Sequence, residues 1–213
     1  MAIDRHPKIR QGEKLARRQA SRSSNERVLI VTEGESTEPR YFREIVKQNR
    51  LAGVEIEGSR GESSPSQLLK RAESIFRYQK GAFDHIYLIF DRDQHACFNK
   101  TITDAKAGFS FNRKSIDVNA VPSNPCFELW FLLHFQDQFS KCTGDQVLVN
   151  LKKYLATYLK NSDSIYKDLN DRGSIGKACS RAKTIRSRQN NPNLSPWTNV
   201  DELLEFLSTL KKP

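Results

Sequence analysis

The chain has 213 residues, of which 37% are hydrophobic and 28% charged, as is typical of a polar globular protein with one sizeable core or at most two small domains. No apolar run approaches the roughly 18 residues of a transmembrane helix, and the N-terminal region lacks the apolar core of a secretory signal. We therefore expect a cytoplasmic protein with no membrane partner. The formal net charge of +10 indicates an anionic partner such as nucleic acid.

The four cysteines are scattered and include no closely spaced pair, so they lack the ligand pattern of a zinc site. We expect free thiols in a reducing compartment. The residues are Cys97, Cys126, Cys142 and Cys179.

Residues 1–26 form a basic tract with few apolar side chains, which predicts a flexible N-terminal arm. Two interpretations stay open: the arm contacts the phosphate backbone of a nucleic acid, or it is a solubilising tail. We expect residues 27–213 to form one domain, with a core at about 27–136 and a helical extension at about 137–213.

Strands and helices that alternate along the predicted core favour an α/β fold, in which helices flank a mainly parallel sheet. Ser64, Pro65 and Gln67 have the pattern of a helix capping box with proline at the first helical position. A later helix is apolar nearly all round, so we expect it to be buried on both sides. The predicted strands are 27–32, 51–57, 85–91 and 115–121, and the predicted helices begin at Thr37 and Ser64 or span 97–107 and 126–135.

The predicted extension is all-helical apart from an irregular loop at 190–197. A helix at 145–160 carries a leucine face and has Thr143 as its cap. Asn199 is expected to cap a final helix, with the Glu202 side chain reaching back to it. Between these lie a short helical turn at 164–169 and a helix at 175–188, and the leucine face consists of Leu148, Leu151, Leu155 and Leu159.

Two of the predicted strands end in acidic residues. The first runs into Glu33 and Gly34, and a later one ends in Asp91-Arg92-Asp93. The carboxyl ends of parallel strands meet at one sheet edge, so these carboxylates could hold Mg²⁺ or Mn²⁺ there. Strand alternation puts Asp91 and Asp93 on the same side and turns Arg92 away. The alternative is that the acids only end the strands, since such residues are common in turns.

These residues carry a resemblance to known families. Glu33-Gly34 together with Asp91-x-Asp93 resembles the Toprim arrangement of topoisomerases, DnaG-type primases and OLD-family nucleases. Three longer motifs with His134, covering roughly residues 26–210, resemble the RloB-like family more closely. The Asn191-Pro192 pair, the Thr198–Val200 segment and the 203–207 run fit that family as well. The three motifs are EGESTEPRYF at 33–42, FDRD at 90–93 and SNPCFELW at 123–130.

The resemblance implies a Toprim-like, Mg²⁺-dependent nuclease effector in antiviral, abortive-infection-type defence, with an AAA or ABC-type ATPase encoded nearby. By motif position, Glu33 would be the general base or a metal ligand, and Asp91 and Asp93 the metal-binding pair. Glu38 is a further candidate ligand. It lies five residues after Glu33. In the Toprim pattern the second acid usually lies three or four residues after the glutamate, so Glu38 departs from that pattern. No topoisomerase tyrosine or primase zinc module is marked out.

Glu128 lies in the apolar helix predicted at 126–135, where an unpaired charge would be costly. One interpretation adds it to the carboxylate cluster as a catalytic, metal-binding or water-orienting group, as the family motif suggests. The other makes it an acid that favours the helix N-terminus. His134 is interpreted as a hydrogen-bonded core histidine, and Trp130 and Trp197 as packing residues.

The helix predicted at 175–188 is strongly basic, which favours contact with a nucleic-acid backbone over a solvated helical face. The function expected from all of this is cleavage of phosphodiester bonds in DNA or RNA. The alternatives are a non-catalytic subunit that binds nucleic acid or regulates an ATPase, and a nucleotidyl-transfer enzyme. Homo-oligomerisation stays open. The candidate nucleic-acid-binding residues are Arg92, Lys177, Arg181, Lys183, Arg186 and Arg188.

Overall fold

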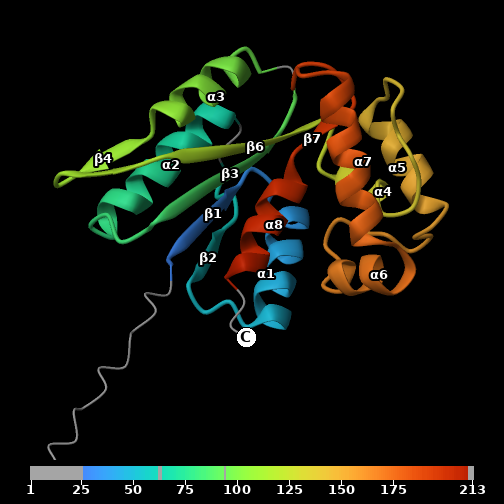
Figure 1. Cartoon of the computed structure of the whole chain (residues 1–213), viewed down its shortest axis with the longest axis horizontal. Coiled ribbons are helices and arrows are strands. Elements are labelled where there is room, and N and C mark those ends of the chain that lie inside the picture. Colours follow the sequence, from blue (N-terminus) through green and yellow to red (C-terminus); the bar gives the residue numbers. More distant parts are fainter. Residues whose placement is uncertain (1–25, 62–63, 94, 211–213) are drawn as a thin grey trace, which may run out of the picture.

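A mainly parallel five-stranded sheet lies at the centre of the protein, in the order β2-β1-β3-β6-β7 (Figure 1). The computed structural model describes residues 26–61, 64–93 and 95–210, so the predicted basic arm lies outside the described residues except for Glu26. Only β7 runs antiparallel, against the end of β6. The predicted α/β class is thus confirmed, whereas its likeness to Toprim stays a prediction. The strands are β1 (Val28–Thr32), β2 (Val54–Glu57), β3 (His85–Asp91), β6 (Val118–Asn124) and β7 (Trp197–Thr198).

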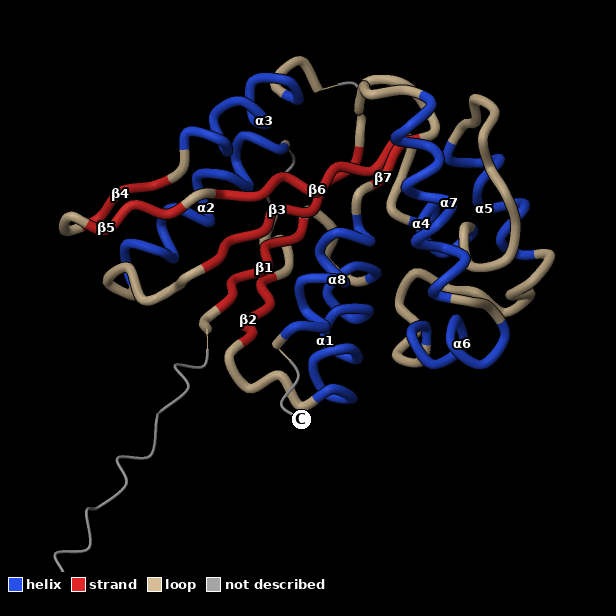
Figure 2. Tube along the Cα trace, in the orientation of Figure 1, coloured by secondary structure: helices blue, strands red, loops and turns tan. Residues whose placement is uncertain are grey.

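Helices cover both faces of the sheet because its central strands are apolar on both sides (Figure 2). Along β1, Leu29 and Val31 pack into one hydrophobic cluster with α2 and α3, while Val28 and Ile30 pack into another with α1 and α8. The second cluster continues into the C-terminal helices. The four flanking helices are α1 (Thr37–Asn49), α2 (Pro65–Tyr78), α3 (Phe98–Ala107) and α8 (Val200–Thr209).

Most of the predicted extension forms a helical layer beside the sheet, on the right in Figure 1. Its apolar side chains join the cluster around α1, and the Trp130 indole N–H donates a 2.8 Å hydrogen bond to the Tyr41 hydroxyl. This bond ties the layer to the first helix of the core. The layer consists of α4 (Glu128–Leu132), α5 (Gly144–Lys152), α6 (Ile165–Arg172) and α7 (Ile175–Arg188).

Several predicted element boundaries were wrong. The apolar segment 126–135 is buried as expected, but α4 spans only Glu128–Leu132, because the backbone then tightens into turns such as His134 N–H to Phe131 C=O. The helix expected to reach residue 160 ends at Lys152, and Leu159 is 64% exposed. Tyr158 is buried in its place.

Two short strand pairs were missed. Phe111 pairs with Lys114 across a two-residue turn in which Asn112 and Arg113 both have positive φ, as a type I′ hairpin requires. This hairpin takes the start of the strand predicted at 115–121, and β6 then runs on to Asn124. β7 arises within the segment expected to be an irregular loop. The hairpin strands are β4 (Phe109–Phe111) and β5 (Lys114–Ile116).

The expected helix caps had mixed outcomes. Thr143 and Gln146 form a complete capping box at α5, so that prediction is confirmed. Ser64 does not cap α2, because its hydroxyl donates to the side chain of Gln67. Asn199 does not cap α8 either, since its Oδ1 accepts no hydrogen bond among the described residues. Among the described residues, no helix has the length and apolar character needed to cross a bilayer.

Candidate active site

The acidic residues from the ends of β1 and β3 meet in one cleft of about 480 Å³. Thr32 lies opposite Ile89 in the parallel register, so Glu33 comes level with Phe90, one residue before Asp91. The Glu33 N–H donates to the Ile89 carbonyl (2.9 Å), and the Asp91 N–H donates to Glu33 Oε2 (3.1 Å). Backbone hydrogen bonds of the sheet therefore fix the orientation of the Glu33 carboxylate next to Asp91. Asp93 lines the same cleft.

Glu38 reaches the cleft from the first turn of α1 and is 6% exposed. Gly34 makes room for it, because a Cβ at residue 34 would lie 2.0 Å from Glu38 Oε2. The Thr32 hydroxyl donates to the Gly34 carbonyl (2.9 Å) and holds this turn. The helical turn therefore brings Glu38 into the cluster despite its departure from the Toprim spacing.

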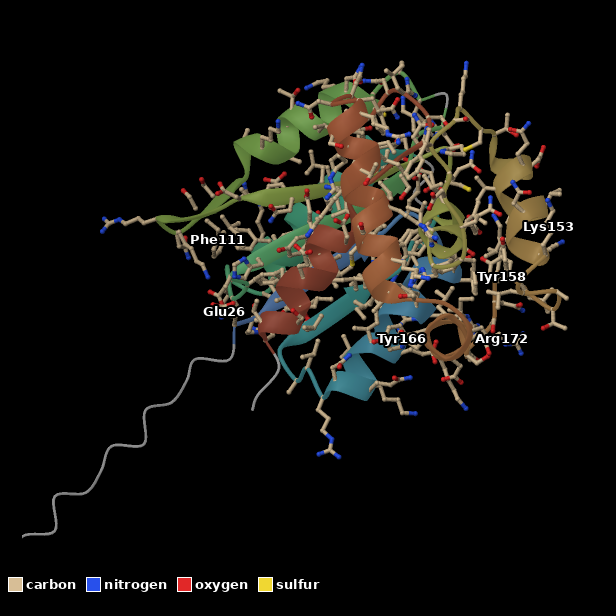
Figure 3. All side chains as sticks on the ribbon, turned by 45° about the vertical axis from the view of Figure 1, so that its right-hand side comes forward. Glu26, Phe111, Lys153, Tyr158, Tyr166 and Arg172 are labelled. Atoms are coloured by element: carbon tan, nitrogen blue, oxygen red, sulfur yellow. The ribbon has the colours of Figure 1, made fainter. Side chains whose placement is uncertain are left out.

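Glu128 completes the acidic lining from α4 and is 3% exposed. The Tyr158 hydroxyl donates to Glu128 Oε1 (3.1 Å), and Lys160 Nζ lies 3.8 Å from the same oxygen. The Thr37 hydroxyl donates to the Lys160 carbonyl (3.1 Å), which anchors this loop to α1. Figure 3 shows Tyr158 on the side of the molecule that the helical layer forms. The Glu128 carboxylate is thus held by side chains of another segment, in addition to its place at the N-terminus of α4.

Tyr158, Lys160 and His95 were missed from the sequence, although all three lie at the cluster. His95 joins Glu33 and Asp93 in a group whose potential ligand atoms lie within 4.8 Å of one another, close enough to hold one cation. The only signal that could have found His95 is its place two residues after Asp-Arg-Asp. Tyr158 and Lys160 belong to a loop without a motif.

The crowding of these acids raises the pKa of several of them. Burial raises the pKa of Asp91 well above its usual range, and the neighbouring carboxylates of Glu38, Glu128 and Glu33 add to the effect. Burial and then the charges of Glu128 and Glu33 raise the pKa of Glu38 to about 7, and burial raises that of Glu33. Asp91 Oδ1 is buried and has no hydrogen-bond partner among the described residues. The cluster therefore favours protons or a cation.

We expect the stability of the protein in EDTA to fall as the pH rises from about 5.5 to 8. In the unfolded chain Glu38 ionises near the usual glutamate pKa of 4.5, but in the fold it does so near 7. The folded state thus binds more protons across this interval, and ionisation at higher pH costs it on the order of 2 kcal/mol relative to pH 5.5. Urea unfolding of the wild type and of Glu38→Gln measures this difference. An equal pH slope in the two proteins would contradict the prediction.

Arg92 faces away from the acids, as alternation predicted. Its guanidinium carbon lies 4.6 Å from the Phe98 ring centroid, and its Nε donates to Asn193 Oδ1 (3.1 Å). Arg92 therefore joins the cleft to α3 and to the loop before β7. Its contact with nucleic acid stays a prediction.

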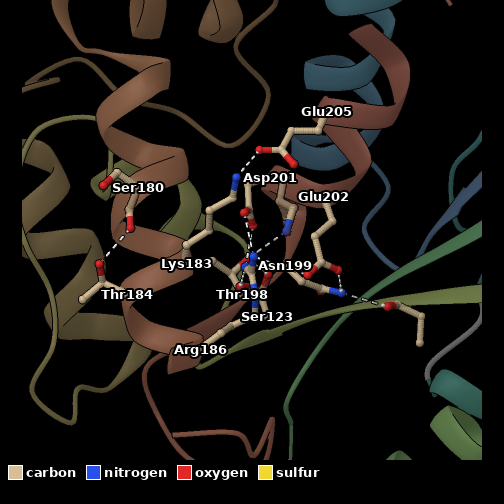
Figure 4. Close-up of polar contacts among 12 residues, drawn as sticks. Ser123, Ser180, Lys183, Thr184, Arg186, Thr198, Asn199, Asp201, Glu202 and Glu205 are labelled. Carbon is tan, nitrogen blue, oxygen red and sulfur yellow. Dashed lines mark hydrogen bonds and ion pairs between the residues drawn. The ribbon is translucent and has the colours of Figure 1, made fainter. Parts of the chain in front are cut away.

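Most of the basic residues of α7 have partners within the chain. Arg186 Nη2 lies 2.7 Å from Oδ2 of Asp201, and Lys183 pairs with Glu205 (Figure 4). Arg181 donates to Asp137 and to the Leu133 carbonyl, and Arg188 lies over the Phe139 ring. Lys177 is exposed. These contacts give α7 a packing role, and phosphate binding by this helix stays a prediction.

The predicted core histidine is confirmed. His134 Nδ1 lies 3.0 Å from the Trp130 carbonyl oxygen, and burial lowers the pKa of the imidazole to about 4. Trp130 is fully buried and Trp197 is 7% exposed, as expected of packing residues. All four cysteines are free thiols.

Comparison with known proteins gives a match over most of the chain. A family model described as "RloB-like protein" matches residues 28–207. The matched range contains the six acids of the cleft together with His95, Tyr158 and Lys160. No curated protein and no solved structure matches the chain.

Proposed function

Since the chain belongs to the RloB-like family, and its acids converge on one cleft, we propose that it is a metal-dependent nuclease that cleaves phosphodiester bonds of DNA or RNA. The observation that carries the proposal is the buried, unpartnered Oδ1 of Asp91. It lies in a cleft with five further carboxylates, and Lys160 is the one lysine or arginine among the described residues that line it. Such a cluster is costly unless a cation or protons offset its charge.

The residues fit a divalent cation such as Mg²⁺ or Mn²⁺, because carboxylate oxygens dominate the donor set. Glu33, Asp91 and Asp93 would hold it, with His95 and Glu38 as further ligands. When bound, the cation offsets the negative charge and polarises a phosphodiester for attack by water.

The side chains of the protein supply the remaining requirements. The Glu33 carboxylate has a raised pKa and a fixed orientation, so it can take the proton of the attacking water. Glu128, held by Tyr158, would orient that water. Lys160 is 69% exposed at the cleft and would attract the phosphate of the substrate.

We further propose that this nuclease acts as an effector in antiviral, abortive-infection-type defence, together with an AAA or ABC-type ATPase encoded nearby. The family membership and the resemblance of its motifs support this setting. Mg²⁺ or Mn²⁺ would be the cofactor, and a Toprim-like arrangement of the sheet would carry the site.

Gly34→Ala is expected to weaken cation binding by roughly tenfold or more and to leave the fold intact. The added Cβ would displace the flexible Glu38 carboxylate and disturb little backbone. Losing or misplacing one partner of a charged contact costs about 1.5–3 kcal/mol. Calorimetric titration with Mn²⁺ measures the affinity. Gly176→Ala is the matched control, since a Cβ there would meet nothing within 4 Å. Unchanged Mn²⁺ affinity in Gly34→Ala would remove Glu38 from the site.

The function is tested by incubating the purified chain with labelled DNA and labelled RNA in Mg²⁺, Mn²⁺ or EDTA, with and without the ATPase. We expect strand loss with metal and none in EDTA. Incorporation of labelled nucleotides would instead identify a nucleotidyl-transfer enzyme. Binding without strand loss under every condition would identify a non-catalytic subunit that binds nucleic acid or regulates the ATPase.

A further inference from the structure

A second cavity, of about 690 Å³, lies along the edge of β6 between α3 and α8. β7 pairs only with Ser123 and Asn124, so no strand among the described residues neighbours β6 on its outer side at 118–122. These residues form the floor of the cavity, and the loop at 190–193 contributes to its wall. The volume lies within the range typical of small-molecule sites.

Two polar atoms on residues that line this cavity are buried and have no hydrogen-bond partner among the described residues. They are the indole Nε1 of Trp197, a donor, and the amide Oδ1 of Asn199, an acceptor. The Nδ2 of Asn199 donates to the Ala120 carbonyl and to Glu202, which fixes the assignment of its amide atoms. Buried polar groups are rarely left unpaired in a native protein. One donor and one acceptor, on residues two apart in the cavity wall, are therefore left for hydrogen bonds to a ligand.

The rest of the lining selects the kind of ligand. Asparagine amides come from several elements, and Tyr87 and Trp197 add aromatic rings. Among the described residues of the lining, only Lys106 and Glu202 are charged, so the cavity does not suit a multiply charged ligand. A planar, uncharged group with alternating donors and acceptors suits it best. The amides belong to Asn99, Asn119, Asn190, Asn193 and Asn199.

We propose that this cavity binds a nucleobase. Asparagine amides pair with base edges, and aromatic side chains stack on base faces. Arg92, which lies between Asp91 and Asp93 in the chain, donates to Asn193, which donates to Asn99 (2.7 Å), so hydrogen bonds join the cavity wall to the segment that carries these two acids. Pro122, on the cavity floor, precedes Ser123, whose register partner is Asp91. A base of the strand in the cleft, or a free nucleotide, is the source.

A peptide strand added to β6 suits the cavity less well. The Ala120 carbonyl already accepts from Asn199, and β7 occupies the edge at 123–124. The free edge is therefore short for strand addition, which depends on a row of main-chain hydrogen bonds.

The test measures binding to the full chain in EDTA, where no metal-dependent cleavage occurs. The probes are the four ribonucleoside monophosphates and short single-stranded DNA and RNA. Trp197→Phe removes the indole N–H and keeps an aromatic ring, and Ala120→Leu fills part of the cavity. Tyr154→Phe is the control, because its hydroxyl bonds to Gln136 outside the cavity.

We expect Trp197→Phe to weaken binding of at least one probe about tenfold, Ala120→Leu to weaken it further, and Tyr154→Phe to leave it unchanged. An effect on oligonucleotides identifies a base of the strand as the source, and an effect on monophosphates alone identifies a free nucleotide. The inference is overturned if none of the probes changes its affinity in both variants. Displacement of a bound probe by a Thr-Val repeat peptide would also overturn it.

The assignment of a strand base rests on the proposed nuclease function, whereas the nucleobase site itself does not. The Asp91→Asn variant, which is expected to lose cleavage but not the cavity, separates the nuclease function from the nucleobase site. Probe binding that responds to the cavity variants, in a chain that cleaves nothing in Mg²⁺ or Mn²⁺, counts against the nuclease function alone. Cleavage with no response to the cavity variants counts against the nucleobase site alone.

Discussion

Asp91→Asn is expected to abolish metal-dependent cleavage and at the same time to stabilise the metal-free protein. The Asp91 Oδ1 is buried without a partner among the described residues, and five other carboxylates line the same cleft, so the charge of Asp91 disfavours the fold unless a cation is bound. An amide removes that charge at nearly constant volume. We expect a loss of cleavage of at least about a thousandfold and a gain of about 1–2 kcal/mol in the free energy of unfolding at pH 8 in EDTA.

Cleavage rates in Mn²⁺ and urea unfolding in EDTA measure the two effects in the same preparations. Asp117→Asn is a suitable control, because that residue is exposed and lies outside the cleft. Glu33→Gln should also lose cleavage, since the amide cannot take a proton from water. An Asp91→Asn protein that cleaves at the wild-type rate would remove the acidic cleft from the reaction.

Arg186→Met is expected to destabilise the protein by about 3–5 kcal/mol, the usual cost of breaking a buried ion pair on one side. Arg186 is 14% exposed and its partner Asp201 is fully buried, so the substitution leaves an uncompensated charge inside the fold. Arg186 also donates to the Thr198 carbonyl and so connects α7, β7 and α8. Urea unfolding at neutral pH measures the loss.

Lys183→Met is the matched control, because Lys183 and Glu205 are both more than half exposed and such pairs contribute little. We expect a change within about 0.5 kcal/mol for this variant. If Arg186→Met were equally mild, Arg186 would be available for phosphate contact after all. Nucleic-acid binding by α7 is better tested at Lys177 and Lys183, whose loss leaves the core intact.

The central sheet and most of the acidic cluster could be predicted from the sequence because local patterns encode them. The apolar runs of β1 and β3 stop at Glu33 and Asp91, and parallel strands bring those ends together. Glu38 was less secure from spacing alone, since its approach depends on the turn at Gly34 and on the start of α1. Glu128 was predicted to join the cluster, and it does so.

The remaining parts of the site depend on contacts between distant segments. Tyr158 and Lys160 lie in a segment whose leucine spacing predicted a helix, but the helix ends at Lys152. They reach the cleft because Thr37 and Glu128 bind them. β7 has two residues and exists only through its register with Ser123 and Asn124. The roles of Arg181 and Arg186 were equally hidden, since a basic helix has the same sequence pattern whether its partners are phosphates or internal carboxylates.

The hydrogen bond from Thr37 to the Lys160 carbonyl has a consequence for when the acidic cleft is completed during synthesis. Glu33, Glu38, Asp91 and Asp93 leave the ribosome well before Tyr158 and Lys160. A nascent chain thus carries the acids without the groups that orient Glu128 and draw a phosphate to them. The activity we propose would therefore arise only after the segment that carries Tyr158 and Lys160 has been made.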